Sequence, residues 1–392
     1  MTRTAITTLL AALTSAAALA GCGDNARAVP PGSGPPADAS PPPGDSAPGP
    51  VVARAVVVAG DFNPGHPGVL STYDPATGVV HSNAGPAMAV GDDPVLRHLG
   101  HELLIVNRAD GNNVTILDDQ SLAFKDQLGT GAASNPQDVA VVGDKLYVPT
   151  YGTAGVTVLT RGSTATSVID LSADDPDGKP NCDSIYLVGS DLYVVCQLLD
   201  DTQMFLPPRG PGKVYVVDTA TDRVRATLTL GHDNPFSLIE QVPAGAPHAG
   251  ELVVGTVLFD DGSGCVERIA PGATPRAAGC LVDNADLGGY ASRIAFQADV
   301  SGALGLFAVP TTFPRADLRA LDMSTGMLRP GALNASTEIV LDVVVCADGS
   351  IIVADPTANA NGLRLYQGGT EKTTAALPIG LPPASTHGLV CY

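Results

Sequence analysis

The sequence contains no tryptophan, and aromatic residues make up only 4% of its 392 residues. It is also poor in basic residues: lysine and arginine total 21 against 40 acidic residues, giving a formal net charge of −19. A chain of this sign repels a phosphate backbone, so we expect no nucleic-acid partner. The shortage of aromatic rings argues against a stacked quinone cofactor and against a carbohydrate-binding face with many stacking platforms.

Familiar catalytic motifs are also missing. The sequence has no Gly-x-Ser-x-Gly elbow, no His-Glu-x-x-His metal motif and no phosphate-binding loop of the Gly-x-x-x-x-Gly-Lys type. The segment from His98 through His101 to Glu102 contains a pair of histidines, but it falls at a strand–turn–strand junction. The helical geometry that a zinc protease requires is therefore absent, and we expect hydrogen-bonded turn histidines there.

The N-terminus has the layout of an export signal. Arg3 supplies one positive charge, an apolar run covers residues 5–20, and small residues close it, so residues 1–21 are predicted to be a cleaved signal peptide. Nine of residues 23–52 are proline, and a segment of this composition cannot bury a core. We expect residues 22–52 to be a disordered tether between the membrane and the folded domain.

The end of the apolar run, Leu19-Ala20-Gly21-Cys22, resembles the lipobox of bacterial lipoproteins. The resemblance implies that Cys22 is lipidated and becomes the first residue after cleavage, which would anchor the chain to a membrane through lipid alone. The alternative is an ordinary signal peptide with a chance cysteine. An aspartate directly after the lipidated cysteine would resemble an inner-membrane retention signal, but here Gly23 separates Cys22 from Asp24. The outer membrane is therefore favoured, and the periplasmic or cell-surface face is left open.

The remaining six cysteines form an even set, as expected for an exported domain stabilised by disulfides. Cys265 and Cys280 are centred on the turn 271–274, so a hairpin would place them opposite each other. The pair Cys182–Cys196 is expected because the two residues bracket a turn. The pair Cys346–Cys391 is expected because the two residues take equivalent positions in their strands. The alternative is that one or more pairs stay reduced and buried.

Residues 53–392 read as strands throughout. Short β-branched runs alternate with glycine, proline, asparagine and aspartate turns, and no long helical period appears. A unit of four strands recurs from about residues 93, 135, 181, 234, 290 and 338, which is typical of propeller blades. Residues 54–86 supply three strands of a seventh unit, and residues 387–392 supply an orphan strand. The sequence thus predicts an all-β, seven-bladed propeller that is closed by its C-terminal strand.

The stretch KVYVVDTATDRVRATLTL at residues 213–230, together with LYVPTYGTAGVTVLT, resembles the YVTN-type repeat of seven-bladed propellers related to surface-layer and NHL proteins. The resemblance implies four-stranded blades around a central channel. The chain lacks the Gly-His and Trp-Asp signature of WD40 proteins.

One loop has a composition compatible with calcium. Asp174, Asp175 and Asp177 precede Gly178, and carboxylates spaced in this way can wrap Ca²⁺. The twelve-residue EF-hand frame and its final glutamate are missing, so a solvated acidic loop is the favoured interpretation and no cofactor is expected. Asp260 and Asp261 before Gly262 are a weaker case of the same kind.

Loops that enter the inner strands and loops that leave the second strands should meet on one face, at the mouth of the channel. The binding residues expected on that face are Asp61, Asp93, Asn107, Asn135, Tyr151, Asn181, Asn234, Arg293 and Asp355. Phe62, Arg108, Thr150, Gln197 and Thr311 follow second strands at the same end. The competing interpretation is that a repeat copies its turn-forming residues without needing a ligand.

Two functions follow from this sequence. The first is a non-enzymatic binding or scaffold module of the cell envelope, which takes an envelope protein or a small polar ligand. The alternative is a metal-assisted, lactonase-like hydrolase on the same propeller, since some propellers of this type have that activity.

Overall fold

The computed structural model describes residues 54–63, 65–299, 302–312, 314–383 and 386–392. The predicted signal peptide, Cys22 and the proline-rich tether at residues 22–52 lie outside the described residues. Within the described part, no helix is long and apolar enough to cross a bilayer.

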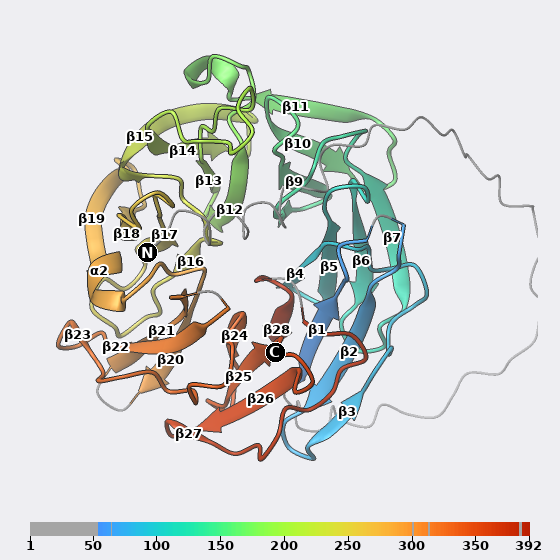
Figure 1. Cartoon of the computed structure of the whole chain (residues 1–392). Coiled ribbons are helices and arrows are strands. Elements are labelled where there is room, and N and C mark those ends of the chain that lie inside the picture. Colours follow the sequence, from blue (N-terminus) through green and yellow to red (C-terminus); the bar gives the residue numbers. More distant parts are fainter. Residues whose placement is uncertain (1–53, 64, 300–301, 313, 384–385) are drawn as a thin grey trace, which may run out of the picture.

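Seven four-stranded antiparallel sheets are arranged as blades around a central axis (Figure 1), which confirms the predicted propeller. The innermost strands are β28 (Leu389–Cys391), β4 (Pro94–Leu99), β8 (Ala140–Val142), β12 (Cys182–Val188), β16 (Glu240–Gln241), β20 (Arg293–Asp299) and β24 (Asp342–Val345). The second strands are β1 (Ala55–Ala59), β5 (Glu102–Asn107), β9 (Lys145–Pro149), β13 (Asp191–Cys196), β17 (Leu252–Gly255), β21 (Gly302–Pro310) and β25 (Ile351–Asp355).

The third strands are β2 (Val69–Asp74), β6 (Asn113–Asp118), β10 (Gly155–Thr160), β14 (Pro211–Asp218), β18 (Cys265–Ala270), β22 (Ala316–Asp322) and β26 (Gly362–Gln367). The outermost strands are β3 (Val79–His81), β7 (Phe124–Gly129), β11 (Thr166–Asp170), β15 (Arg223–Asp233), β19 (Arg276–Asp283), β23 (Met327–Leu328) and β27 (Thr370–Glu371). Blades 1 to 7 are named here in chain order, starting with the blade of β1. Two short helical segments interrupt the strands: η2 (Ser172–Asp174) and α2 (Asn284–Leu287).

The ring closes as predicted, because the last strand completes the first blade. In β28, Cys391 pairs with Ala55 and Leu389 pairs with Val57, both antiparallel. The amide of Arg54 also donates to the carbonyl of Tyr392 at 2.7 Å. The two ends of the described chain therefore share one sheet, and the inner edge of β1 is paired.

Apolar residues fill the spaces between adjacent blades, and one hydrophobic cluster lies between each pair of neighbours. The turns are repeated as well. In four blades an aspartate at the end of the third strand accepts hydrogen bonds from the two amides that lie two and three residues ahead, which fixes the tight turn into the outer strand. These aspartates are Asp74, Asp118, Asp218 and Asp322.

The three predicted cysteine pairs form disulfides: Cys182–Cys196, Cys265–Cys280 and Cys346–Cys391. One detail of the expected register was wrong. Cys265 lies opposite Asp283, and Cys280 lies opposite Glu267, because the β18–β19 hairpin contains irregularities that shift its pairing. Cys182 and Cys196 are direct partners, and a bulge between Cys182 and Ser184 makes this register possible.

Candidate functional site

The residues that enter the inner strands share one backbone role. Each carbonyl accepts a hydrogen bond from the amide of a residue that follows the second strand of the same blade, at 3.0–3.1 Å. The pairs are Asp93 with Arg108, Asn135 with Tyr151, Asn181 with Gln197, and Asn234 with Val257. The three asparagines have φ values of 47°, 50° and 48°, a left-handed conformation that asparagine tolerates well. The two sets of loops therefore lie together on one face.

Several of the predicted binding residues use their side chains inside the fold. Asn107 is buried, accepts from the amide of Gly91 at 2.8 Å and donates to Asn113. Asp355 is buried beside the guanidinium of Arg364, whose Nε lies 2.6 Å from its Oδ2. The side chains of Asn181 and Asn234 are also buried and hydrogen-bonded, to Asp201 and Leu199 and to Val257, respectively. These residues shape the loops.

Three predicted residues stay closer to solvent. Asp61 is exposed, and hydrogen bonds from Asn63 and His66 lower its pKa to about 2, so it carries a charge at neutral pH. Asn135 is half-buried and accepts from the amide of Ala109 at 3.1 Å. Tyr151 is half-buried and belongs to the polar cluster described below.

Charged side chains cross the centre of the ring below this face. Arg293 of blade 6 is only 8% exposed and donates to Asp342 at 3.0 Å and to Glu240 at 2.5 Å. Glu240 also lies 3.9 Å from Arg97 of blade 2, so one carboxylate links blades that are far apart in sequence. Arg293 is thus paired inside the ring, below the rim where the sequence placed a free positive charge.

His387 fills the same central region. Its Nε2 lies 3.2 Å from the carbonyl of Ser292 in blade 6, while its own carbonyl accepts from the amide of Leu96 in blade 2. Burial, together with Arg293, Arg108 and Arg97, holds the pKa of His387 well below its usual range. The imidazole is therefore neutral at physiological pH, and the channel is crossed by side chains at this level.

A polar cluster, defined here as Arg108, Tyr151 and Asp183, lies where the first three entering loops meet the channel. Arg108 donates to Asp93 Oδ1 at 2.5 Å and to Gln137 at 3.3 Å. The hydroxyl of Tyr151 lies 2.5 Å from Gln197 Oε1 and 3.3 Å from Asp183 Oδ1. Within the described residues, Arg108 Nε and Asp183 Oδ2 are buried and have no hydrogen-bond partner.

Asp183 owes its position to the bulge in β12. The register shifts between Cys182 and Ser184, so Asp183 is the extra residue, and such bulges redirect a side chain. Burial raises the pKa of Asp183 to about 7, and the nearby carboxylate of Asp138 adds to this effect while Arg108 opposes it. Near neutral pH this carboxyl group can therefore either accept or donate a hydrogen bond.

An aromatic cluster, defined as Phe236, Phe259 and Tyr290, lies next along the same face. The three rings pack edge to face, with centroids 5.3–5.9 Å apart. The carbonyl of Pro235, adjacent to Phe236, accepts a hydrogen bond from Gln197 at 2.8 Å. Gln197 therefore connects the aromatic cluster to Tyr151, and all three rings are half-buried.

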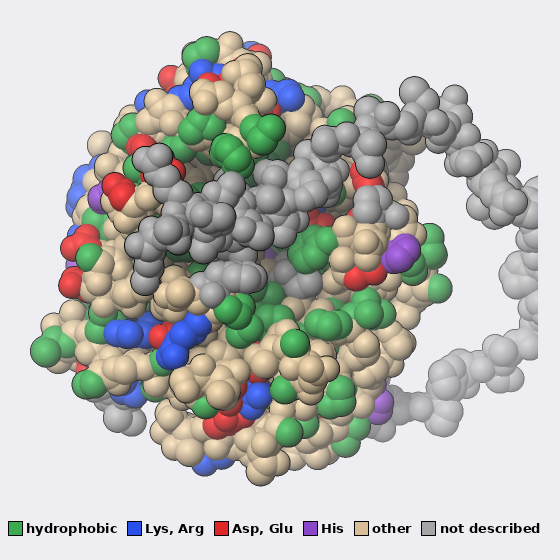
Figure 2. Space-filling model, in the orientation of Figure 1, with side chains coloured by type: hydrophobic (Ala, Val, Ile, Leu, Met, Phe, Trp, Pro, Cys, Tyr) green, Lys and Arg blue, Asp and Glu red, His purple; other side chains and the backbone are tan. Residues whose placement is uncertain are grey.

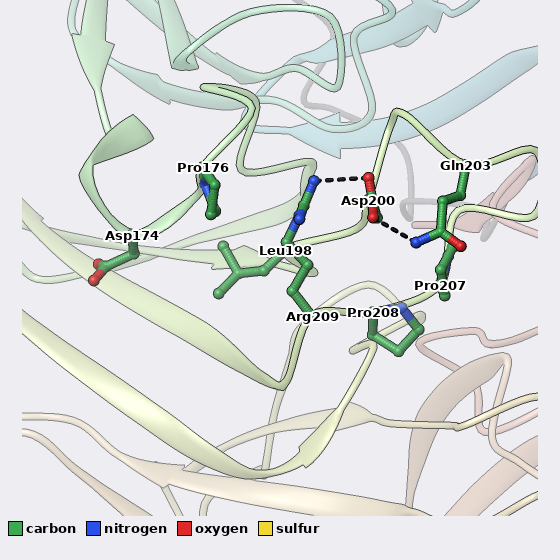
Figure 3. Close-up of a pocket in the computed structure, with 8 residues that line it drawn as sticks. All are labelled: Asp174, Pro176, Leu198, Asp200, Gln203, Pro207, Pro208 and Arg209. Carbon is green, nitrogen blue, oxygen red and sulfur yellow. Dashed lines mark hydrogen bonds and ion pairs between the residues drawn. The ribbon is translucent and has the colours of Figure 1, made fainter.

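A second hollow lies over blade 4. A cavity of about 510 Å³ is bordered by two loops, residues 171–181 and 197–210, and Figure 3 shows the side chains that line it. The acidic loop whose composition is compatible with Ca²⁺ lies here. Arg209 lies 3.0 Å from Asp177 of this loop and 2.7 Å from Asp200 of the second loop. The guanidinium therefore links the two loops through their carboxylates.

Within the described residues, only His232, Cys265 and Cys280 bring three metal-ligating atoms within 4.8 Å of one another. They lie on strands of blades 4 and 5, away from the inner strands. The histidine pair singled out in the sequence lies at a strand–turn–strand junction, as expected. His98 contacts Asp119 at 3.0 Å and stacks on Tyr392.

Charged groups on the face in Figure 2 are scattered among apolar and polar side chains. Lysine and arginine side chains occur in small groups beside carboxylates, and no continuous basic stripe is seen on the described part of this face.

The sequence matches no known family model and no curated protein. The fold is similar to that of the periplasmic gluconolactonase PpgL of Pseudomonas aeruginosa, with a TM-score of 0.58 and 17% identity, covering 86% of this chain and 99% of that one. It is also similar to the β-propeller domain of Cps50 (Swd1) from Myceliophteria thermophila, with a TM-score of 0.50 and 10% identity, covering 73% and 86% of the two chains. At such identities the likeness concerns the fold alone.

Sequence reasoning missed the charged groups inside the ring: Arg97, Asp138, Asp183, Glu240, Asp342 and His387. A signal was present, because Arg97 interrupts the apolar run of β4 and Asp342 begins the run of β24. An ionisable residue in an otherwise buried strand needs a partner, and so it marks a buried network.

Proposed function

We propose that this propeller is a non-enzymatic binding module that takes a small polar ligand at the channel mouth, through Arg108, Tyr151 and Asp183. The observation that carries the proposal is the pair of buried, unpartnered polar atoms, Arg108 Nε and Asp183 Oδ2. An unsatisfied buried polar atom typically costs about 1–3 kcal/mol. A ligand that displaced the groups covering these two atoms, and that supplied an acceptor to Arg108 and a donor or acceptor to Asp183, would recover part of that free energy.

The surroundings narrow the chemistry of the ligand. Asp183 with a pKa of about 7 can bind a hydroxyl or an amine, and Arg108 favours an oxygen acceptor. The aromatic cluster offers an apolar surface beside these groups. A compact molecule with several hydroxyl groups and one apolar face therefore suits the site, and the crossing side chains Glu240 and Arg293 would confine it to the mouth.

The proposal includes the location of the domain. The lipobox-like segment and the proline-rich tether support a lipid-anchored protein of the cell envelope, with Cys22 as the anchor and the outer membrane as the favoured site. The ligand would then be a solute of that compartment.

The test is a thermal-shift screen of the purified full chain with hydroxylated monosaccharides, sugar acids and amino acids. A ligand that raises the melting temperature of the unmodified chain should lose that effect in Asp183→Asn and in Tyr151→Phe. Asp144→Asn, which alters an exposed turn of blade 3, is the matched control and should keep the full shift. Equal shifts in all variants would place the ligand elsewhere.

The second candidate is the lactonase-like hydrolase, and one observation favours it. A carboxyl group with a pKa of about 7 beside a guanidinium is suited to act as a general base, with Arg108 stabilising a developing oxyanion. Acid release from an aldonolactone, lost in Asp183→Asn, would support hydrolysis over simple binding. Loss of the same activity on chelation of divalent metals would favour the metal-assisted version.

A further inference from the structure

His232, Cys265 and Cys280 bring two blades together around a disulfide. His232 is near the end of β15 in blade 4, whereas the cysteines lie on β18 and β19 of blade 5. Nδ1 of His232 lies 3.5 Å from Sγ of Cys265 and 4.0 Å from Sγ of Cys280. The imidazole therefore faces both sulfur atoms of the bond.

The first of these separations matches an edge of a metal polyhedron, and the second is about 0.5 Å longer. With metal–sulfur bonds of about 2.3 Å and metal–nitrogen bonds of about 2.0 Å, the nitrogen and sulfur ligands of a tetrahedral zinc ion lie about 3.5 Å apart. Only the distance between the two sulfurs is incompatible, because they are covalently joined. Once the bond is reduced, the sulfurs need to separate to about 3.8 Å to complete the geometry.

The histidine is fixed in place by a neighbouring carboxylate. Glu267, which is 1% exposed, accepts hydrogen bonds from the amides of Gly231 and His232 at 2.9 and 2.7 Å. The same carboxylate lies 3.0 Å from His232 Nδ1, the atom that faces the sulfurs, so an ion bound at Nδ1 replaces this hydrogen bond. Glu267 acts as a positioning residue through its two backbone contacts.

The site is reachable from solvent. The side chain of His232 is 37% exposed, and Cys280 is half-buried, whereas Cys265 is fully buried. An incoming thiolate therefore attacks Cys280 Sγ and expels Cys265 as a thiolate. The pair Cys182–Cys196 offers no such access, since both of its residues are fully buried.

We infer that reduction of Cys265–Cys280 creates a binding site for a thiophilic divalent ion such as Zn²⁺, with Cys265, Cys280 and His232 as ligands and water in the fourth position. A dithiol supplies the electrons: it becomes a cyclic disulfide and yields two cysteine thiols. Binding of the ion then releases the two thiol protons as the thiolates coordinate. In the oxidised chain the site is closed, so the disulfide acts as a redox gate.

Cobalt(II) titration of the purified full chain tests this inference, because thiolate ligands and tetrahedral geometry give characteristic absorption bands. The chain reduced by a mild dithiol should develop these bands, and the oxidised chain should not. His232→Ala should weaken cobalt affinity by about ten-fold or more. His248→Ala is the matched control, since His248 is a histidine of blade 5, where both cysteines lie, and its side chain is 40% exposed.

Two further measurements keep the test decisive. Alkylation mapped by mass spectrometry should find Cys265 and Cys280 reduced before Cys182 and Cys196, and zinc should protect Cys265 and Cys280 from modification. The inference would be overturned if the cobalt absorption bands persisted in the double variant Cys265→Ser with Cys280→Ser. It would also be overturned if His232→Ala left the cobalt affinity unchanged. Loss of the β-sheet circular dichroism on mild reduction of this pair would do the same, because the site needs blades 4 and 5 to stay packed.

Discussion

Asp138 and Asp342 make the same three hydrogen bonds in two different parts of the ring. Each accepts from an arginine of the preceding blade, from the next amide in its own chain and from an inner-strand amide of the following blade. For Asp138 the donors are Arg97, Val139 and Ile185, at 2.7, 2.8 and 2.9 Å. For Asp342 they are Arg293, Val343 and Leu389, at 3.0, 2.8 and 2.9 Å. Each carboxylate therefore joins three consecutive blades.

This relationship predicts a large cost for removing Asp342. Asp342→Ala would leave the buried guanidinium of Arg293 with one carboxylate partner fewer and would leave two amides without their acceptor. We therefore expect a loss of about 3–5 kcal/mol in the free energy of unfolding. Urea denaturation measures it. Asp191→Ala is the control, because Asp191 pairs with the exposed Arg225 and such surface pairs contribute about 0–1 kcal/mol. Equal losses in the two variants would contradict the structural role of Asp342.

Ring closure gives a second prediction. The Cys346–Cys391 disulfide joins blade 7 to the strand that completes blade 1, and it spans 45 residues. Cys391→Ser together with Cys346→Ser should lower the free energy of unfolding by about 2–5 kcal/mol. Hydrogen exchange should accelerate first in β1 and β28, since their pairing then depends on hydrogen bonds and packing alone. Protection in these strands that is unchanged by the double substitution would refute this account of closure.

The proposed lipid anchor gives a third prediction. In a bacterial host that processes lipoproteins, the chain should fractionate with membranes and gain the mass of a diacylglyceryl group on Cys22. Cys22→Ser, with residues 1–21 replaced by an ordinary cleavable signal peptide, should appear in the soluble fraction at the same abundance, because only the anchor has changed. A chain that remains membrane-bound after this substitution would be held by another contact.

Local patterns made most of the fold predictable. Several blades repeat a turn residue, such as the aspartate that ends the third strand in four of them, and each blade is built mainly from neighbours in sequence. The three-strand unit at residues 54–86 and the orphan strand at residues 387–392 then required closure, and the cysteine pairs followed from hairpin spacing and equivalent strand positions. The register of Cys265 and Cys280 was missed because irregularities in the β18–β19 hairpin leave no clear mark in the sequence.

The centre of the ring was less predictable. Glu240 lies near Arg97 although 143 positions separate them, and that proximity arises only when the blades close into a ring. Asp183 was overlooked for a different reason: a bulge turns it toward Tyr151, and the sequence shows only one extra residue between two cysteines of a hairpin. Contacts of this kind depend on the curvature of the whole ring.

The carboxyl group of Asp183, whose Oδ2 has no hydrogen-bond partner, gives a prediction about pH. Its pKa is about 7 in the folded chain against an ordinary value of 3.8, so between these limits the folded state binds more protons than the unfolded state. The contribution of Asp183 to stability is therefore fully present below about pH 4 and is lost as the pH rises through 7. A shift of this size corresponds to at most about 4 kcal/mol.

Asp183→Asn removes this titration while keeping the shape of the side chain. Relative to the unmodified chain, the variant should therefore gain stability between about pH 4 and pH 7 and level off above pH 7, as measured by urea unfolding at several pH values. Asp144→Asn, in an exposed turn, should show a difference that does not change over this range. The stability difference between Asp183→Asn and the unmodified chain could instead be independent of pH, or could fall as the pH rises. Either result would mean that the carboxyl group is already ionised in the folded chain and is satisfied by a partner. The channel mouth would then lose the unsatisfied group on which the proposed ligand site depends.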